Sequence, residues 1–275
     1  MSQTPQTVTS HLLERPEGRL SYVVRGEGPL VICLPGMGDV QATFRFLTPA
    51  LAAAGYRAVT MDLRGHGDSD ATFTTYDDGA AAGDLVALIE QLGGPAILLG
   101  NSMGAAAVAM AAARRPDLVT GLVLVGPFVR DRPVGLAMRI LFRITMAPMW
   151  ARAVWRLYLP TLYAGRHPDD FDAHRAAIMA ALRKPGHTRA FSQTTHTAHA
   201  PAEALLGSVR APSLVVMGVR DPDFTDPRAE ADWIASRLGS EVVMVDDAGH
   251  YPHSQQPDVV NPAVIGFADR VSSGA

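Results

Sequence analysis

The sequence predicts an α/β fold in which helices cover both faces of a mostly parallel sheet and a helical segment is inserted before the last strands. Short apolar runs alternate with helical patterns in two stretches of the chain, and this alternation stops between about residues 127 and 206. Hydrophobic residues make up 48% of the 275 residues and charged residues 19%. This composition is sufficient for a large buried core and argues against disorder.

The first stretch of alternation ends near residue 125. Apolar runs of strand length occupy residues 20–25, 29–34, 56–62, 96–99 and 118–125. Helical patterns occupy residues 44–54, 76–92 and 102–115, and a Gly or Pro follows each of them. Short, continuously apolar strands joined by helices are typical of a parallel sheet that is buried on both faces.

The inserted segment has a different pattern. Residues 127–206 contain no convincing buried strand, and Met, Trp and Tyr recur there at helical spacing. The alternation then resumes with strands at 213–217 and 241–245, each followed by a helical pattern. We therefore predict a core formed by residues 1–126 and 207–275, and a helical cap formed by residues 127–206.

Charge and hydropathy exclude several classes of partner. The formal net charge is −3 with both signs scattered, and no run of Lys or Arg suggests a nucleic-acid partner. No apolar stretch approaches the ~20 residues of a membrane span, and no signal peptide is evident. We expect a cytoplasmic monomer or homodimer that acts on a small molecule without a cofactor or a metal.

Ser102 is the candidate nucleophile. It lies in the pentapeptide GNSMG, residues 100–104, between a predicted strand and a predicted helix. Glycines two residues away on each side permit a strained turn that exposes the serine hydroxyl. The backbone N–H of Met103 would then point at a developing oxyanion from the N-terminal end of the helix. The alternative is an ordinary turn in which Ser102 caps the helix.

Asp221 and His250 are the candidate acid and base. A serine needs a base to accept its proton, and a histidine base needs a third group to hold its tautomer. Folds with this type of nucleophile turn place the acid and then the base after the serine. Asp221 and His250 follow the strands 213–217 and 241–245, so both lie where open α/β sheets place their sites.

Other residues compete for these roles. Asp223 is an alternative acid, and His253 is an alternative base. His196 and His199 have a spacing that could mimic a metal-binding pair. Because no third ligand is near them in the sequence, we interpret both as solvent-facing or pocket-lining residues.

A glycine-rich turn supplies the second candidate oxyanion donor. The strand 29–34 runs into PGMGD, residues 35–39, where the backbone can approach a substrate oxygen closely. We predict that the Met37 N–H is the donor and that its side chain lines an apolar pocket; a plain turn is the alternative. The polar turn at residues 62–69 is predicted to organise the loops and has no catalytic role.

With these motifs in place, the chain resembles the α/β-hydrolase fold family along its full length. The matching marks are PGMG at 35–38, D-x-R-G-x-G-x-S at 62–69, GNSMG at 100–104, G-x-x-D at 218–221 and AGH at 248–250. The resemblance implies a mostly parallel eight-stranded sheet and a catalytic triad of Ser102, Asp221 and His250. It also implies an oxyanion hole formed by the N–H groups of Met37 and Met103, beneath a cap.

The departures from the family pattern narrow the chemistry. Many relatives have His-Gly where this chain has Pro35 and Gly36. Ser102 argues against epoxide hydrolases and haloalkane dehalogenases, which need a carboxylate at this position. The GNSMG string is similar to that of carbon–carbon bond hydrolases, but the extended Ser-Gly-Pro-Gly-type oxyanion loop of that group is missing.

The cap is expected to set the specificity. We predict that Met146, Trp150, Trp155 and Tyr158 line the substrate pocket, which would suit an apolar or aromatic group. The leading hypothesis is an esterase-like enzyme that cleaves a carboxylic ester, thioester or lactone through an acyl-serine intermediate. The alternatives are a carbon–carbon bond hydrolase or cofactor-free perhydrolase with the same triad, and a slow or non-catalytic small-molecule receptor.

Overall fold

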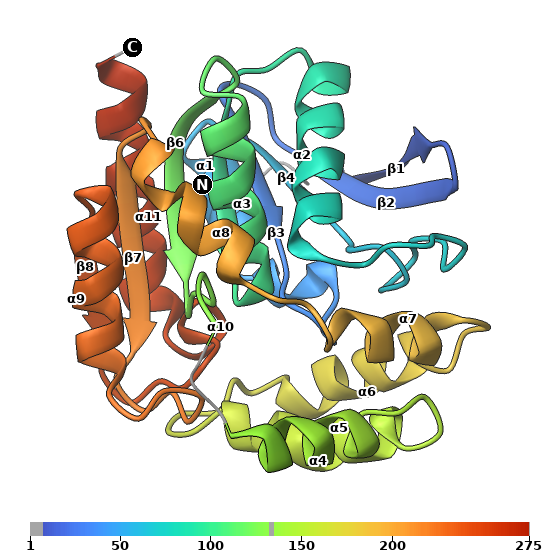
Figure 1. The fold of residues 1–275 in the computed structure, drawn as a ribbon. Helices are drawn as coiled ribbons and strands as arrows, with labels where there is room; N and C mark the ends of the chain where they lie inside the picture. The colour runs from blue at the N-terminus through green and yellow to red at the C-terminus, as the bar shows by residue number, and fades with distance from the viewer. Residues whose placement is uncertain (1–7, 132–134, 275) are drawn as a thin grey trace.

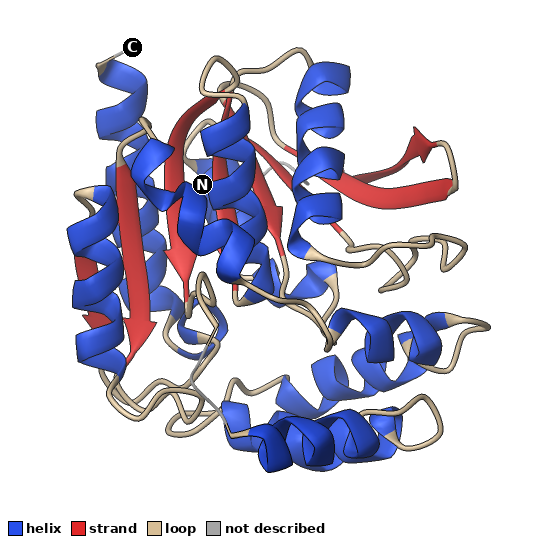
Figure 2. Ribbon diagram, viewed as in Figure 1, coloured by secondary structure: helices blue, strands red, loops and turns tan. Residues whose placement is uncertain are grey.

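The computed structural model describes residues 8–131 and 135–274, which form an eight-stranded sheet with helices on both faces (Figures 1 and 2). The predicted absence of a signal peptide concerns residues that lie largely outside this range. Among the described residues, no helix has the length and apolar character needed to cross a membrane.

The sheet has the strand order β1-β2-β4-β3-β5-β6-β7-β8. Strands β1 and β2 are antiparallel to their neighbours, and β3 to β8 run parallel. This confirms the predicted mostly parallel sheet. The strands are β1 Val8–Arg15, β2 Gly18–Arg25, β3 Leu30–Leu34, β4 Arg57–Met61, β5 Ala96–Asn101, β6 Val119–Val125, β7 Ser213–Gly218 and β8 Glu241–Val245.

Strand β1 was not predicted from the sequence. Within the described part of the chain it is an edge strand that pairs only with β2, and Leu12 on it is 46% exposed. Its sequence, VTSHLLER, interrupts the apolar residues with polar ones, so it lacks the continuous apolar run by which the other strands were recognised.

Alternate residues of the central strands supply two separate cores. In β3, Ile32 and Leu34 pack on one face, whereas Val31 and Cys33 pack on the other. This is the two-residue period of a strand, applied to a sheet that is buried on both sides. Helices α2 Asp78–Leu92, α3 Met103–Arg114 and α9 Pro227–Leu238 cover the first face, and α1 Leu47–Ala53 and α11 Pro257–Ser273 cover the second.

Four helices lie beyond the ends of the parallel strands (Figure 1). They are α4 Leu136–Thr145, α5 Ala151–Leu162, α6 Phe171–Ala181 and α7 His187–Thr194. The last helix of the segment predicted as the cap, α8 Ala200–Leu205, packs against α3 of the core instead. Its buried Ala202 belongs to the same hydrophobic cluster as the residues of α3.

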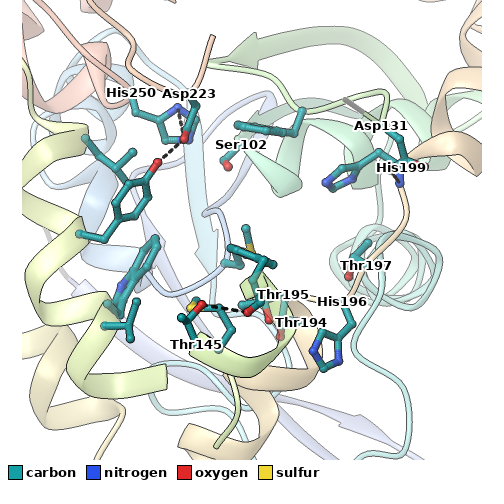
Figure 3. Close-up of a pocket in the computed structure, with 18 of the residues that line it drawn as sticks. Ser102, Asp131, Thr145, Thr194, Thr195, His196, Thr197, His199, Asp223 and His250 are labelled. Atoms are coloured by element: carbon teal, nitrogen blue, oxygen red, sulfur yellow. Dashed lines mark hydrogen bonds and ion pairs between the residues drawn. The ribbon is translucent and has the colours of Figure 1, made fainter. Parts of the chain in front are cut away.

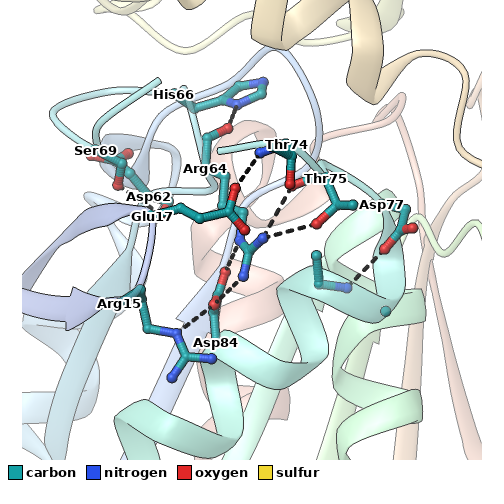
Figure 4. Close-up of polar contacts among 12 residues, drawn as sticks. Arg15, Glu17, Asp62, Arg64, His66, Ser69, Thr74, Thr75, Asp77 and Asp84 are labelled. Carbon is teal, nitrogen blue, oxygen red and sulfur yellow. Dashed lines mark hydrogen bonds and ion pairs between the residues drawn. The ribbon is translucent and has the colours of Figure 1, made fainter. Parts of the chain in front are cut away.

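The polar turn after β4 joins the loops to the sheet (Figure 4). Arg64 donates two hydrogen bonds to Asp84 of α2, at 2.6 and 2.8 Å, and Arg15 of β1 donates a third at 2.9 Å. Asp62 accepts from the backbone N–H of Gln41 at 2.7 Å, and burial raises its pKa to about 7. A Cβ on Gly67 would lie 2.1 Å from the Asp62 carboxylate, so only glycine fits beside this acid.

Candidate active site

Ser102 lies at the strand-to-helix turn between β5 and α3. Its φ of 56° and ψ of −124° place a non-glycine residue in a strained backbone conformation. A Cβ on Gly100 would lie 2.2 Å from the Gly104 carbonyl oxygen, and one on Gly104 would lie 2.5 Å from that of Leu34. Both flanking glycines are therefore required by close backbone packing. Ser102 occupies the N-cap position of α3, but its side chain makes no capping hydrogen bond.

Asp221 and His250 form a buried hydrogen-bonded pair. Asp221 Oδ2 lies 2.7 Å from His250 Nδ1, and the two side chains are 0% and 2% exposed. Because Nδ1 faces the acid, Nε2 is the ring nitrogen available to a group in the cavity. Burial lowers the pKa of His250, but the charge and hydrogen bond of Asp221 outweigh it and raise the pKa to about 9.

The geometry separates these two residues from their competitors. Asp223 Oδ2 lies 3.8 Å from His250 Nδ1, more than 1 Å farther than Asp221. The N–H of Asp223 instead donates to Asp221 Oδ1 at 3.0 Å, which holds that carboxylate in place. His253 is fully buried, with its Nε2 3.0 Å from Thr43 Oγ1, and burial lowers its pKa to about 3.

The glycine-rich turn after β3 lies against the nucleophile. A Cβ on Gly36 would lie 2.6 Å from the Cβ of Ser102, so the backbone at Gly36 approaches this residue too closely for any larger side chain. Met37 is half-buried and lines the same cavity as Ser102. Met103 is the first residue of α3, where backbone N–H groups have no helical acceptor. The N–H groups of Met37 and Met103 remain the candidate oxyanion donors that the sequence predicts.

Helices α5 and α6 hold this turn from the other side. Trp155 Nε1 donates to the Gly38 carbonyl at 2.7 Å, and His174 Nε2 lies 3.0 Å from Asp39 Oδ1. Burial opposes the ionisation of Asp39, but His174 and the N–H of Val40 hold its pKa below the usual range. The loop that approaches Ser102 is thus bonded directly to the inserted helices.

Ser102 and His250 share one cavity of about 730 Å³ (Figure 3). Three of the four predicted pocket residues, Met146, Trp155 and Tyr158, line it. Trp150 does not line it, and its side chain is 54% exposed. Trp150 precedes Trp155 by five residues, about 140° around a helix, whereas Tyr158 is three residues away and shares the inner face.

Two residues that were not predicted from the sequence support the site. Asn101 Nδ2 donates to the backbone carbonyls of Val125 and His250, at 3.0 and 3.2 Å, and so joins the nucleophile turn to the His250 loop. The Phe128 ring packs edge-on against the imidazole of His250, with centroids 5.7 Å apart. The only sequence signal for either residue is its place beside a motif or at a strand end.

Asp221, Asp223 and His250 are also the one group of potential metal ligands within the described residues, with ligand atoms within 4.8 Å of one another. His250 Nδ1 is directed at Asp221 at hydrogen-bond distance. We interpret the group as a hydrogen-bonded acid–base pair with a supporting acid.

A mostly parallel eight-stranded sheet with a serine at a strained strand-to-helix turn, and a His–Asp pair beside it, defines an α/β hydrolase. The sequence profile of the alpha/beta hydrolase family matches residues 31–263. The chain belongs to this enzyme family.

Curated relatives have several activities. The chain is 28% identical over 290 residues to 2-(acetamidomethylene)succinate hydrolase of Mesorhizobium japonicum, covering 98% of this chain and all of that one. It is 33% identical over 231 residues to pimeloyl-[acyl-carrier protein] methyl ester esterase of Neisseria meningitidis serogroup B, covering 81% of this chain and 86% of the other. It is 31% identical over 278 residues to the polyketide synthase ThaQ of Burkholderia thailandensis, covering 98% of this chain, but it spans only 13% of that protein's length.

A solved structure has the same fold. The bromoperoxidase of Bacillus anthracis superposes with a TM-score of 0.82 at 20% identity, covering 95% of this chain and all of that one. At this identity the likeness shows the fold alone.

Proposed function

We propose that the chain is a serine hydrolase that cleaves a carboxylic ester, thioester or lactone of a small apolar or aromatic substrate through an acyl-Ser102 intermediate. The observation that carries the proposal is a serine at a strained turn that shares a cavity with His250, whose Nδ1 lies 2.7 Å from a buried Asp221. The names of two relatives, a methyl ester esterase and a 2-(acetamidomethylene)succinate hydrolase, are consistent with this chemistry.

The proposed reaction has two halves. His250 Nε2 accepts the proton of Ser102 Oγ as this oxygen attacks the carbonyl carbon, and the N–H groups of Met37 and Met103 donate to the resulting oxyanion. His250 then protonates the leaving alcohol or thiol, and Asp221 stabilises the imidazolium between these steps. Water, deprotonated by His250, hydrolyses the acyl-serine and restores the enzyme.

The placement of α4 to α7 supports a role as a cap. In this proposal they close the cavity above Ser102, and Met146, Trp155 and Tyr158 contact the apolar part of the substrate. A serine rather than a carboxylate at position 102 favours acyl transfer over epoxide opening.

Labelling with a fluorophosphonate probe tests the proposal. We expect the wild type to label and Ser102→Ala to lose the label, while Ser236→Ala, on the exposed surface of α9, labels as the wild type does. A folded wild-type protein that does not label would exclude the serine hydrolase. Labelling without turnover of any ester, thioester or lactone would favour the alternative of a slow or non-catalytic small-molecule receptor. Turnover of carbon–carbon or peracid substrates but of no ester, thioester or lactone would favour the carbon–carbon bond hydrolase or the perhydrolase.

A further inference from the structure

Two helices of the inserted segment expose large apolar side chains that the proposed reaction does not use. Six of these side chains lie on or between α4 and α5, and each is between 50% and 77% exposed. We call them the outer face: Ile140, Leu141, Ile144, Met149, Trp150 and Leu157. Both helices lie at the same end of the molecule (Figure 1). Single exposed apolar residues are ordinary, but a group of this size marks a binding surface.

The spacing of these residues places them on the solvent side of each helix. Ile144 comes two positions after Phe142 of α4, and Leu157 comes two positions after Trp155 of α5. Two positions correspond to about 200° around a helix, so each pair points in opposite directions. Phe142 and Trp155 line the cavity, whereas Ile144 and Leu157 are 58% and 72% exposed. The outer face is therefore distinct from the lining that contacts the substrate.

The segment that carries the outer face is basic. Between Asp131 and Asp169 the sequence has six arginines and no acidic residue, although the chain as a whole has a net charge of −3. Arg143, Arg152 and Arg156 are exposed, and none of them forms an ion pair with another described residue. The exposed apolar side chains thus have positive charges beside them and no acid that would neutralise these charges.

This combination fits an anionic lipid surface. The apolar side chains of an interfacial helix enter the boundary between head groups and acyl chains, while arginines attract the anionic head groups. Trp150 suits the same boundary, because an indole has an apolar body and an N–H donor. A second copy of the chain fits less well, since a symmetric contact would place arginines against arginines. Residues 1–7, 132–134 and 275, outside the described ranges, include no acid that could pair with them.

The outer face also lies close to the cavity that holds Ser102. Met138, Phe142 and Arg143 of α4 line that cavity, and the same helix carries half of the outer face. Lipid bound at α4 is therefore one helix diameter away from the cavity lining, about 10–12 Å.

We propose that the outer face of α4 and α5 docks the protein on an anionic lipid surface. The contact is peripheral, with the two helices lying along the surface rather than crossing it. Docking places the cavity beside the lipid, where apolar molecules concentrate. The inference goes beyond the proposed reaction and does not depend on it, because docking needs no turnover.

Vesicle co-sedimentation tests the proposal, with phosphatidylcholine vesicles compared with vesicles that also contain about 30% phosphatidylglycerol. We expect the wild type to bind the anionic vesicles at least about tenfold more tightly, and raised salt to weaken this binding. Arg152→Gln combined with Arg156→Gln should weaken it about tenfold through lost charge. Ile144→Ser combined with Leu157→Ser should weaken it about tenfold through lost apolar contact.

The matched control is Leu12→Ser combined with Val259→Ser, whose side chains are 46% and 48% exposed on β1 and α11. This control should bind the vesicles as the wild type does, and circular dichroism should show that all variants are folded. Trp150 supplies a second measurement that reports on orientation. Brominated phospholipid should quench its fluorescence, and Trp150→Phe should lose this quenching while it keeps vesicle binding.

The inference is wrong if the wild type does not bind anionic vesicles, binds both vesicle types equally, or loses no affinity in the two outer-face variants. Absent vesicle binding with self-association of the wild type in analytical ultracentrifugation would assign the outer face to a second copy. Binding to poly-L-glutamate but not to vesicles would assign it to an acidic protein. None of these results alters the outcome of fluorophosphonate labelling at Ser102, so the two proposals fail separately.

Discussion

Protonation of His250 controls the proposed reaction at the scale of single residues. The pKa of His250 is raised to about 9, because the Asp221 carboxylate outweighs the effect of burial. Below that pH the imidazole is protonated and cannot accept the Ser102 proton. The pKa of His250 is higher in the folded protein than the ordinary pKa of a histidine in the unfolded chain. Protonation of His250 therefore stabilises the fold at pH values below that ordinary pKa, and this stabilisation is lost as pH rises through about 9.

We therefore expect kcat/KM for a neutral ester to rise with pH and to level off only above about 9. Initial rates over a pH series, corrected for spontaneous hydrolysis, measure the profile. In Asp221→Asn the rise of kcat/KM should occur at lower pH, because the charge that raises the pKa of His250 is gone. If kcat/KM of this variant rises at the same pH as that of the wild type, Asp221 does not set the pKa of His250.

The choice of acid is testable with a matched pair. Asp221→Asn should lower kcat about 10³- to 10⁴-fold, because an asparagine can hold His250 in the wrong tautomer. Asp223→Asn, two residues away, should cost less than about tenfold, since its carboxylate lies 3.8 Å from Nδ1 and not 2.7 Å. Steady-state kinetics of both variants decide the matter, and similar losses in the two would contradict the assignment of Asp221.

At the scale of secondary-structure elements, buried polar groups join neighbouring elements, in addition to the two hydrophobic cores. The guanidinium groups of Arg15 and Arg64 converge on Asp84 of α2, whose side chain is 2% exposed. This contact ties β1, the turn after β4 and α2 to one another (Figure 4). Lys184 lies in the segment after α6, and its Nζ donates a 2.7 Å hydrogen bond to the carbonyl of Gly67 in this turn.

Asp84→Ala should lower the free energy of unfolding by about 3–5 kcal/mol, because it leaves two arginines without their buried acceptor. Urea denaturation measures the change. Glu241→Ala removes an exposed partner of Arg270 and serves as the control, with an expected loss of less than about 1 kcal/mol. Equal losses in the two variants would mean that burial of Asp84 adds nothing to the contact.

At the scale of the whole molecule, the inserted helices are docked on the core by an apolar cluster that includes Val40 and Tyr251 of the core, and by polar contacts. Arg45 of the core makes two hydrogen bonds of 2.6 Å to Asp170, just before α6. Trp155 bonds the Gly38 carbonyl, and His174 pairs with Asp39. Two of these contacts lie on the turn that approaches Ser102, so movement of the helices is coupled to the geometry of the site.

Arg45→Ala should loosen α6 without unfolding the core. We expect faster amide hydrogen exchange in α6 and a loss of about 1 kcal/mol, since Asp170 is 42% exposed and solvent screens the pair. Mass-spectrometric exchange locates the effect. Arg175→Ala is the control, because this arginine pairs with Asp172 within α6 and not with the core. Unchanged exchange in α6 of Arg45→Ala would show that apolar packing alone docks the helix.

The sequence by itself determined the class of fold and the order of the candidate groups. Continuous apolar strands, helix-ending glycines and motifs at strand ends are local patterns, so they indicate Ser102, Asp221 and His250 without any knowledge of packing. Strand β1 was not predicted because polar residues interrupt its apolar ones, so the local pattern is missing.

Only the tertiary structure decided which side chains meet. The sequence favours Asp221 and leaves Asp223 as an alternative acid, and distances of 2.7 and 3.8 Å to His250 Nδ1 distinguish the two. Trp150 and Trp155 both lie in the inserted segment, but helix geometry turns Trp150 outward and Trp155 into the cavity. His199, just before α8, meets Asp78 of α2 because both helices pack against α3, and no local pattern encodes that contact. Contacts between distant elements depend on how their apolar faces pack, which is a property of the folded chain.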